Sequence, residues 1–201
     1  DYGANIFNIA VWYSLILFFV AKVNPLKFYK KSFQPWAIAF STCSSAAALP
    51  VTMKVGTNEL GIPKETASFI LPLGATANMN GTGIYFGIVV MFAAQLYGIP
   101  ISIGQQVMLV LTATMLSIGC AAAPQTGLII SIALLTGLGI PLDGIALIAG
   151  VYRIVDQIHT STNALGDLVI GTSVSALEDD LDWDIFNHGG MFANNNVSKG
   201  I

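Results

Sequence analysis

The central part of the chain, residues 66–142, contains no Asp, Glu, Lys, Arg or His. Inside this apolar run, the polar pentapeptide Asn78-Met79-Asn80-Gly81-Thr82 separates one apolar segment, residues 66–77, from another, residues 84–97. In a lipid bilayer, an interrupted helix is tolerated at membrane depth only where its free backbone groups are buried in protein or line a cavity. The pattern therefore predicts a broken transmembrane helix over residues 66–97 that lines a binding site.

The same alternation of apolar and polar segments predicts four further elements. Residues 3–22 are apolar and reach the roughly 20 residues that cross a bilayer. Residues 32–57 and 104–138 each have two apolar arms around a tip of small residues, a layout that indicates two re-entrant helical hairpins and an internal repeat. Residues 145–171 form one long helix, and residues 172–201 form a polar, acidic tail whose Asn- and Gly-rich end we expect to be disordered.

Composition assigns these helices to a membrane. Hydrophobic residues make up 54% of the chain and charged residues 9%, whereas soluble domains carry about 25% charged residues. The predicted fold class is an all-α membrane protein, expected in the plasma (inner) membrane. Because the chain starts at Asp1, with neither Met nor a signal-peptide layout, we expect a fragment of a longer protein.

The basic residues and the cysteines add two constraints. By the positive-inside rule, residues 22–31 lie in the cytoplasm, because four lysines cluster there with no acidic residue between them: Lys22, Lys27, Lys30 and Lys31. Cys43 and Cys120 lack the spacing of a zinc site, and a disulfide framework is not expected.

The helix over residues 145–171 carries ionisable groups in an apolar setting. At 3.6 residues per turn, one of its faces presents Asp156, His159 or Thr160, Asn163 and Asp167. Because an ionisable residue inside a membrane costs at least ~2.5 kcal/mol, both aspartates are functional candidates. Structural alternatives are an ion pair between Asp156 and Arg153, a solvated carboxylate at Asp167, and a buried, hydrogen-bonded His159.

The chemistry of the interruption favours an alkali cation. Asn78, Asn80 and Thr82 can cap the two half-helices, but the break also frees carbonyl oxygens, which are hard ligands that suit sodium. The absence of a Cys or His cluster disfavours a transition metal.

Other classes of protein remain as alternatives. Ser44 and Ser45 either contact a ligand or allow close helix packing. A hydrolase built from Ser44, His159 and Asp156 is disfavoured because no Gly-x-Ser-x-Gly motif is present, so an enzyme is not expected. An ion channel stays open as an alternative, because half-helix ends also build selectivity filters. No nucleic acid is expected as a partner.

Four motifs stand out along the chain: SSAAALPVTM at residues 44–53, LPLGATANMNGT at residues 71–82, Pro124 with Gly127, and TSTNALGD at residues 160–167. Together they resemble the dicarboxylate/amino acid:cation symporters, the glutamate-transporter family, over about residues 3 to 171. The resemblance implies a sodium-coupled symporter of the elevator type, in which a transport domain moves past a trimeric scaffold and the hairpin at 104–138 is the external gate. This chain then corresponds to most of the transport domain, and the first five helices of the family are missing.

The resemblance also implies site residues, position by position. The implied substrate contacts are Ser44, Ser45, Thr82, Ala123, Pro124, Asp156, His159, Thr160 and Asn163, with Asp156 holding the substrate amino group. One implied sodium site comprises Gly74, Asn78, Asn163 and Asp167. The other uses carbonyl groups around Thr76, Ser117, Ile118 and Cys120.

Two positions depart from the family pattern. His159 stands where members for acidic amino acids carry Arg, and imidazole cannot reproduce the bidentate fork of a guanidinium. We therefore expect a neutral or small polar amino acid. The alternative is an acidic amino acid or dicarboxylate held by protonated His159, whose affinity would rise as the pH falls through about 6.5. Asn80 stands where the family usually has Asp, which predicts fewer coupled sodium ions.

Overall fold

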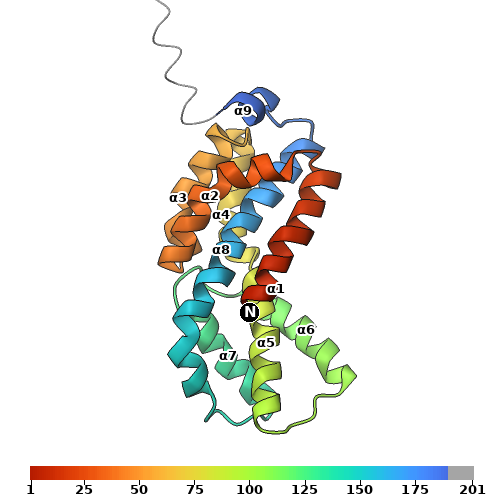
Figure 1. Ribbon diagram of the computed structural model, residues 1–201, viewed down its shortest axis with the longest axis vertical. Coiled ribbons are helices and arrows are strands. Elements are labelled where there is room, and N and C mark those ends of the chain that lie inside the picture. The colour runs from red at the N-terminus through yellow and green to blue at the C-terminus, as the bar shows by residue number, and fades with distance from the viewer. Residues whose placement is uncertain (190–201) are drawn as a thin grey trace, which may run out of the picture.

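The computed structural model describes residues 1–189, and every regular element in that range is helical. In the elongated molecule of Figure 1, the pair α2–α3 and the pair α6–α7 lie toward opposite ends, and α8 runs through both halves. The all-α prediction is confirmed for these residues. In chain order the elements are α1 (Tyr2–Phe7), η1 (Asn8–Tyr13), η2 (Ile16–Val20), α2 (Pro25–Thr42), α3 (Ser45–Asn58), α4 (Lys64–Ala77), α5 (Asn80–Leu96), α6 (Ile103–Ile118), α7 (Thr126–Gly137), α8 (Ile145–Leu177) and α9 (Trp183–His188).

The first helical segment corresponds to the predicted helix over residues 3–22. It runs from Tyr2 to Val20 and is apolar and long enough to cross a membrane, as is the stretch Lys64–Leu96, which includes the break. Two of its parts, η1 and η2, are π-helical, a feature for which the hydrophobic pattern holds no signal. The segment ends before Lys22, whose φ of 55° is left-handed.

The pair α2–α3 begins earlier than the predicted hairpin over residues 32–57. Asn24 caps α2 because its side chain accepts hydrogen bonds from the backbone N–H groups of Leu26 and Lys27, and Pro25 occupies the first helical position. Residues 25–31, predicted as part of a loop, are therefore helical. At the other end of α2, Cys43 is left-handed (φ 53°), and the Ser44 side chain accepts from Ala47 N, which starts α3.

The break between α4 and α5 is narrower than the predicted pentapeptide. Only Asn78 and Met79 are non-helical, whereas residues 80–82 form the first turn of α5. The difference comes from a contact with another helix, because the free N–H of Gly81 donates to the side-chain oxygen of Asn163 on α8, at 2.7 Å. A neighbouring helix thus supplies the acceptor that the broken helix lacks.

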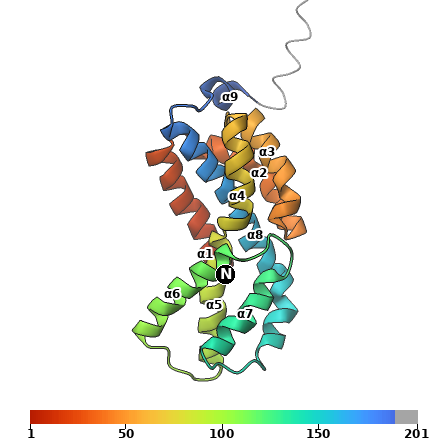
Figure 2. The same cartoon turned by 180° about the vertical axis from the view of Figure 1, so that it is seen from behind.

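The pair α6–α7 lies in the range 103–137, where the sequence predicts a hairpin over residues 104–138. Ser102 and Gln105 form a capping box at the start of α6, and Gln125, with a left-handed φ of 68°, precedes α7. Figure 2 shows the two helices on either side of α5. That either pair enters and leaves a membrane on one side remains a proposal.

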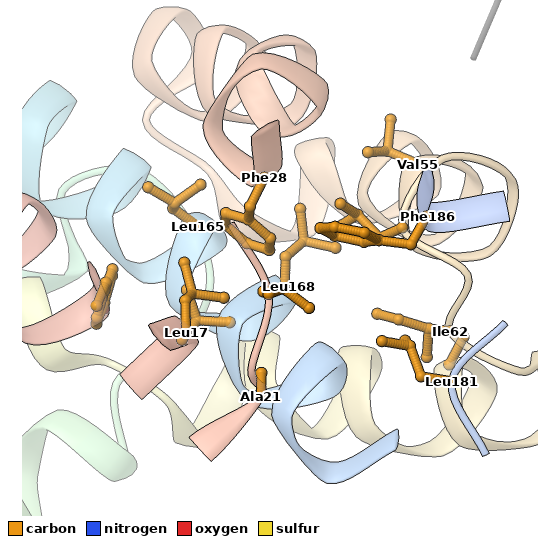
Figure 3. Close-up of a cluster of buried hydrophobic side chains, with 14 of the residues drawn as sticks. Leu17, Ala21, Phe28, Val55, Ile62, Leu165, Leu168, Leu181 and Phe186 are labelled. Atoms are coloured by element: carbon orange, nitrogen blue, oxygen red, sulfur yellow. The ribbon is translucent and has the colours of Figure 1, made fainter. Parts of the chain in front are cut away.

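The C-terminal region differs most from prediction. Helix α8 continues to Leu177, beyond the expected end at residue 171, and the small residues Thr172, Ser173 and Ser175 in this extension are buried. Phe186 of α9 is 2% exposed and is packed in the cluster of Figure 3 with Phe28, Leu168 and others. The expected tail is therefore ordered up to residue 189, and the expectation of disorder at its Asn- and Gly-rich end falls largely on residues 190–201, outside the described range.

Lysine side chains hold α9 against the rest of the chain. The Nζ of Lys31 donates to the carbonyl oxygens of Glu59, Ile185 and Gly189 at 2.6–3.1 Å. The Nζ of Lys27 donates to the carbonyl oxygen of Asn187 at 2.8 Å. Residues 178–184, which lead into α9, include five acidic residues, but α9 itself is held by the buried ring of Phe186 and by these lysines.

Two hydrophobic clusters leave a polar layer between them. The first includes Leu165 and Leu168 of α8 together with residues of the first helical segment, α2, α3, α4 and α9 (Figure 3). The second includes Ile148 and Tyr152 of α8 together with residues of α5, α6 and α7. Along α8, residues 156–163 fall between the clusters. This is where the polar side chains of α8 meet the break.

Candidate functional site

Asn163 connects α8 to the first turn of α5. Its side-chain oxygen accepts the Gly81 N–H at 2.7 Å, and its nitrogen donates to Thr82 Oγ1 at 2.9 Å. Asn163 is 2% exposed. Because both ends of the amide are used, its orientation is fixed, and Thr82 is held beside α8.

One helical turn further along α8, Asp167 faces the last turn of α4. Asn78 Nδ2 donates to Asp167 Oδ1 at 2.9 Å, and a Cβ added at Gly74 would lie 2.6 Å from the same oxygen, so only glycine permits this approach. Asp167 is 2% exposed, and no basic group of residues 1–189 lies within 4 Å of it. The structure thus brings Gly74, Asn78 and Asp167 together, with Asn163 on the same face of α8.

This group of residues fits a small hard cation. A buried carboxylate without a positive partner is costly, and a bound cation removes that cost. Carboxylate, amide and backbone oxygens are the donors that alkali and alkaline-earth cations prefer. For Asn78 to contribute its side-chain oxygen to such an ion, its amide has to turn, because its nitrogen faces Asp167 Oδ1.

The residues of the other sodium set are less clearly brought together. Ser117 O accepts the N–H of Cys120 at 3.1 Å, and the Ser117 side chain lies near α5, 3.7 Å from a Cβ built at Gly83. Ile118 is exposed, and Thr76 is an exposed residue near the end of α4. This set stays a prediction.

Asp156 is surrounded by hydrogen-bond donors. Its Oδ1 accepts from Thr160 Oγ1 at 2.7 Å and lies 3.0 Å from His159 Nε2, while its Oδ2 accepts from Gln125 N at 3.1 Å. The ion pair with Arg153 is not formed, because the Arg153 guanidinium donates to the carbonyl oxygen of Ser41 at 3.0 Å. Asp156 is therefore bound to its own helix and to the tip of α6–α7.

The tip of α2–α3, around residues 43–46, contacts the tip of α6–α7, residues 119–125, close to Asp156. Ala122 O accepts from Ser44 Oγ at 2.9 Å and from Ala46 N at 3.3 Å. Because Ser44 donates to a carbonyl oxygen and His159 lies against Asp156, the arrangement gives no support to a Ser-His nucleophile. Between the tips and α8 lies a cavity of about 20 Å³, and all the predicted substrate residues except Ser44 and Pro124 line it.

Six lining residues were not predicted as part of the site: Cys43, Met79, Ala121, Ala122, Gly127 and Tyr152. Tyr152 precedes Asp156 by four residues, so the helical period that selected Asp156 would also have selected it. Its ring packs on His159 at 5.9 Å between centroids, and Tyr85 packs on His159 at 5.2 Å. A larger open groove of about 1020 Å³ runs along η1, α5 and α6, but it is mostly apolar and has neither aspartate of the site in its lining.

The chain is similar in sequence to known transporters. The chain is 42% identical over 153 residues to an excitatory amino acid transporter of Caenorhabditis elegans, which covers 76% of this chain and 30% of the relative. It is 41% identical over 157 residues to excitatory amino acid transporter 2 of Mus musculus, covering 78% and 27%. The matched region is thus less than a third of the length of each of these relatives. The model of the sodium:dicarboxylate symporter family matches residues 2–177, and the chain therefore belongs to that family.

Proposed function

We propose that this chain forms the substrate- and ion-binding part of a sodium-coupled amino acid symporter. The observation that carries the proposal is Asp167, a carboxylate that is 2% exposed and bonded to Asn78 at 2.9 Å in a family of sodium symporters. A sodium ion held by Gly74, Asn78, Asn163 and Asp167 supplies the missing positive charge. The carbonyl groups around Thr76, Ser117, Ile118 and Cys120 are proposed as a further sodium site.

The substrate lies between the two tips and α8 in this proposal. Asp156 holds the substrate amino group, because a carboxylate attracts an ammonium group and the movement of the tip frees the oxygen that now accepts from Gln125 N. Ser44, Ser45, Ala123 and Pro124 close over the substrate from the tips. The main-chain groups of the substrate replace the hydrogen bonds from Ser44 to Ala122 and from Gln125 to Asp156.

The substrate side chain faces His159. A histidine in contact with Asp156 offers no free guanidinium-like fork, which supports a neutral or small polar amino acid. The second candidate is an acidic substrate held by protonated His159, supported by relatives that are named excitatory amino acid transporters.

An elevator movement with α6–α7 as external gate accounts for the tip contacts. Substrate entry requires the bonds from Ser44 to Ala122 and from Gln125 to Asp156 to break, which opens α6–α7. In this proposal, the scaffold and the contacts of the homotrimer are formed by segments outside the matched region. In this scheme the site accepts ligand from one side of the membrane at a time.

Reconstitution of the complete protein in proteoliposomes tests the function. We expect saturable accumulation of labelled amino acid that depends on an inward sodium gradient and stops when choline replaces sodium. Uptake without saturation or accumulation would favour the channel instead. Competition by aspartate, glutamate, serine and alanine at pH 6 and pH 8 tests the substrate class: we expect serine and alanine to compete best at pH 8, and aspartate winning there would overturn the neutral assignment.

A further inference from the structure

Two buried polar atoms beside Asp156 have no hydrogen-bond partner within residues 1–189: His159 Nδ1 and the hydroxyl oxygen of Tyr152. Both residues are 2% exposed. A buried polar group without a partner is unfavourable, because the hydrogen bond to water that it gave up has not been replaced. Two such atoms on rings whose centroids are 5.9 Å apart indicate that a ligand completes the hydrogen bonding.

The two atoms differ in chemistry. His159 Nε2 lies 3.0 Å from a carboxylate oxygen of Asp156, so in the neutral ring this nitrogen carries the hydrogen and Nδ1 is an acceptor. The hydroxyl of Tyr152 has a hydrogen to donate. The pair therefore presents one acceptor and one donor.

Tyr152 and His159 both line the cavity of about 20 Å³ beside Asp156 and Thr160. A polar cavity of that size holds about one water-sized group. On the side of α7, a Cβ added at Gly127 would lie 2.5 Å from the Tyr152 hydroxyl oxygen. Glycine at this position leaves room for that hydroxyl, and the space suits a group no larger than a hydroxyl.

We propose that Tyr152 and His159 select a small amino acid whose side chain carries a hydroxyl group. The substrate hydroxyl donates to His159 Nδ1 and accepts from the Tyr152 O–H, so one group satisfies both atoms. A methyl group in its place leaves both atoms unpaired. This selection rests on the proposed function of the same site as an amino acid symporter.

Serine against alanine is the direct test, with threonine against valine as a second hydroxyl-to-methyl pair. Sites that bond a substrate hydroxyl discriminate strongly against analogues that lack it, so in sodium-dependent competition we expect serine to exceed alanine in affinity by about tenfold or more. In Tyr152→Phe, which keeps the ring, we expect this ratio to fall to about twofold, with the affinity for alanine nearly unchanged.

Tyr85→Phe is the matched control. Tyr85 also packs on His159, but its hydroxyl already accepts from Ser131 Oγ at 2.9 Å, so its loss should leave the serine-to-alanine ratio unchanged. If Tyr152→Phe is not produced, Gly127→Ala serves as the second variant, because the added methyl group pushes the Tyr152 hydroxyl away. The same loss of serine preference is expected.

The outcomes separate this selection from the function on which it rests. Sodium-dependent uptake with equal affinities for serine and alanine, or an unchanged ratio in Tyr152→Phe, overturns the selection and leaves the symporter intact. Failure of every amino acid to bind or enter with sodium overturns the proposed function and the selection with it.

Discussion

Replacing Asp167 with Asn is expected to increase stability in the absence of sodium and to remove stabilisation by sodium. The substitution keeps the shape of the side chain and its hydrogen bond to Asn78, which is 2.9 Å long in the structure, but it removes the charge. A buried, unpaired ion costs several kcal/mol even after relaxation, and Asp167 is 2% exposed. Most polar substitutions in a core destabilise a protein, so the direction of this effect is diagnostic.

The magnitude follows from the linkage between binding and folding. A ligand present at 100 times its dissociation constant stabilises the folded state by about 2.7 kcal/mol. For a chain of this size, about 1 kcal/mol corresponds to roughly 2–4 °C in Tm, so saturating sodium should raise the wild-type Tm by about 5–10 °C. In Asp167→Asn this rise should fall below about 2 °C, because the ion loses its charged ligand.

Thermal unfolding of the purified protein in detergent measures both effects, with sodium chloride titrated against choline chloride at constant ionic strength. Asp143→Asn is the matched control, because Asp143 is exposed just before α8 and its charge is already solvated. The control should keep the full sodium response. A wild-type sodium response in Asp167→Asn would refute the assignment of this carboxylate to the cation.

Three further predictions concern other parts of the chain. Asn80→Asp should add a carboxylate near the break and raise the number of sodium ions per substrate, as measured by reversal potentials; a wild-type value of three ions would contradict the inference from Asn80. Gly81→Ala should lower the free energy of unfolding by about 2 kcal/mol or more, because the added Cβ meets the backbone carbonyl oxygen of His159 on α8. Gly87→Ala on the same helix has open space around its Cβ and should raise that free energy by about 0.5–1 kcal/mol. Denaturant unfolding compares the two variants, and equal effects would argue against the close approach of α5 to α8. Lys31→Met should speed backbone hydrogen exchange in α9, because three carbonyl groups lose their charged donor. Lys30→Met, at an exposed lysine, should leave the exchange rates unchanged. Similar rates in both variants would show that the Lys31 bonds do not hold α9 in place.

The sequence predicted those features that have a local chemical cause. The break at Asn78, the two tips and the polar face of α8 all follow from residue types and helical period, and the structure has each of them within a few residues. The helix over residues 25–31 differs from the prediction because a lysine cluster indicates a loop, although Asn24 and Pro25 are a strong helix start. Helix α9 has no clear signal in the sequence, because its position depends on the ring of Phe186 packing against residues that are distant in the sequence, such as Phe28 and Val55.

The site was less predictable where it depends on contacts between elements. That Asn163 accepts from Gly81 shortens the break, but nothing in either segment alone indicates the bond. The unpaired hydroxyl of Tyr152 is likewise a property of the packed structure, since tyrosine is common in apolar helices and usually finds a partner. Helical period identifies its face and not its lack of a partner.

Asn163 has a consequence for energetics as well as for geometry. Its amide contacts the turn that holds Thr82, and it lies one helical turn from both Asp167 and Thr160, so it belongs to the proposed ion set and to the proposed substrate set. Two ligands that share a group are thermodynamically linked: if sodium raises the affinity for substrate by some factor, substrate raises the affinity for sodium by the same factor. If Asn163 contacts both ligands as proposed, coupling of the two gradients needs no long-range signal, because one residue takes part in both equilibria.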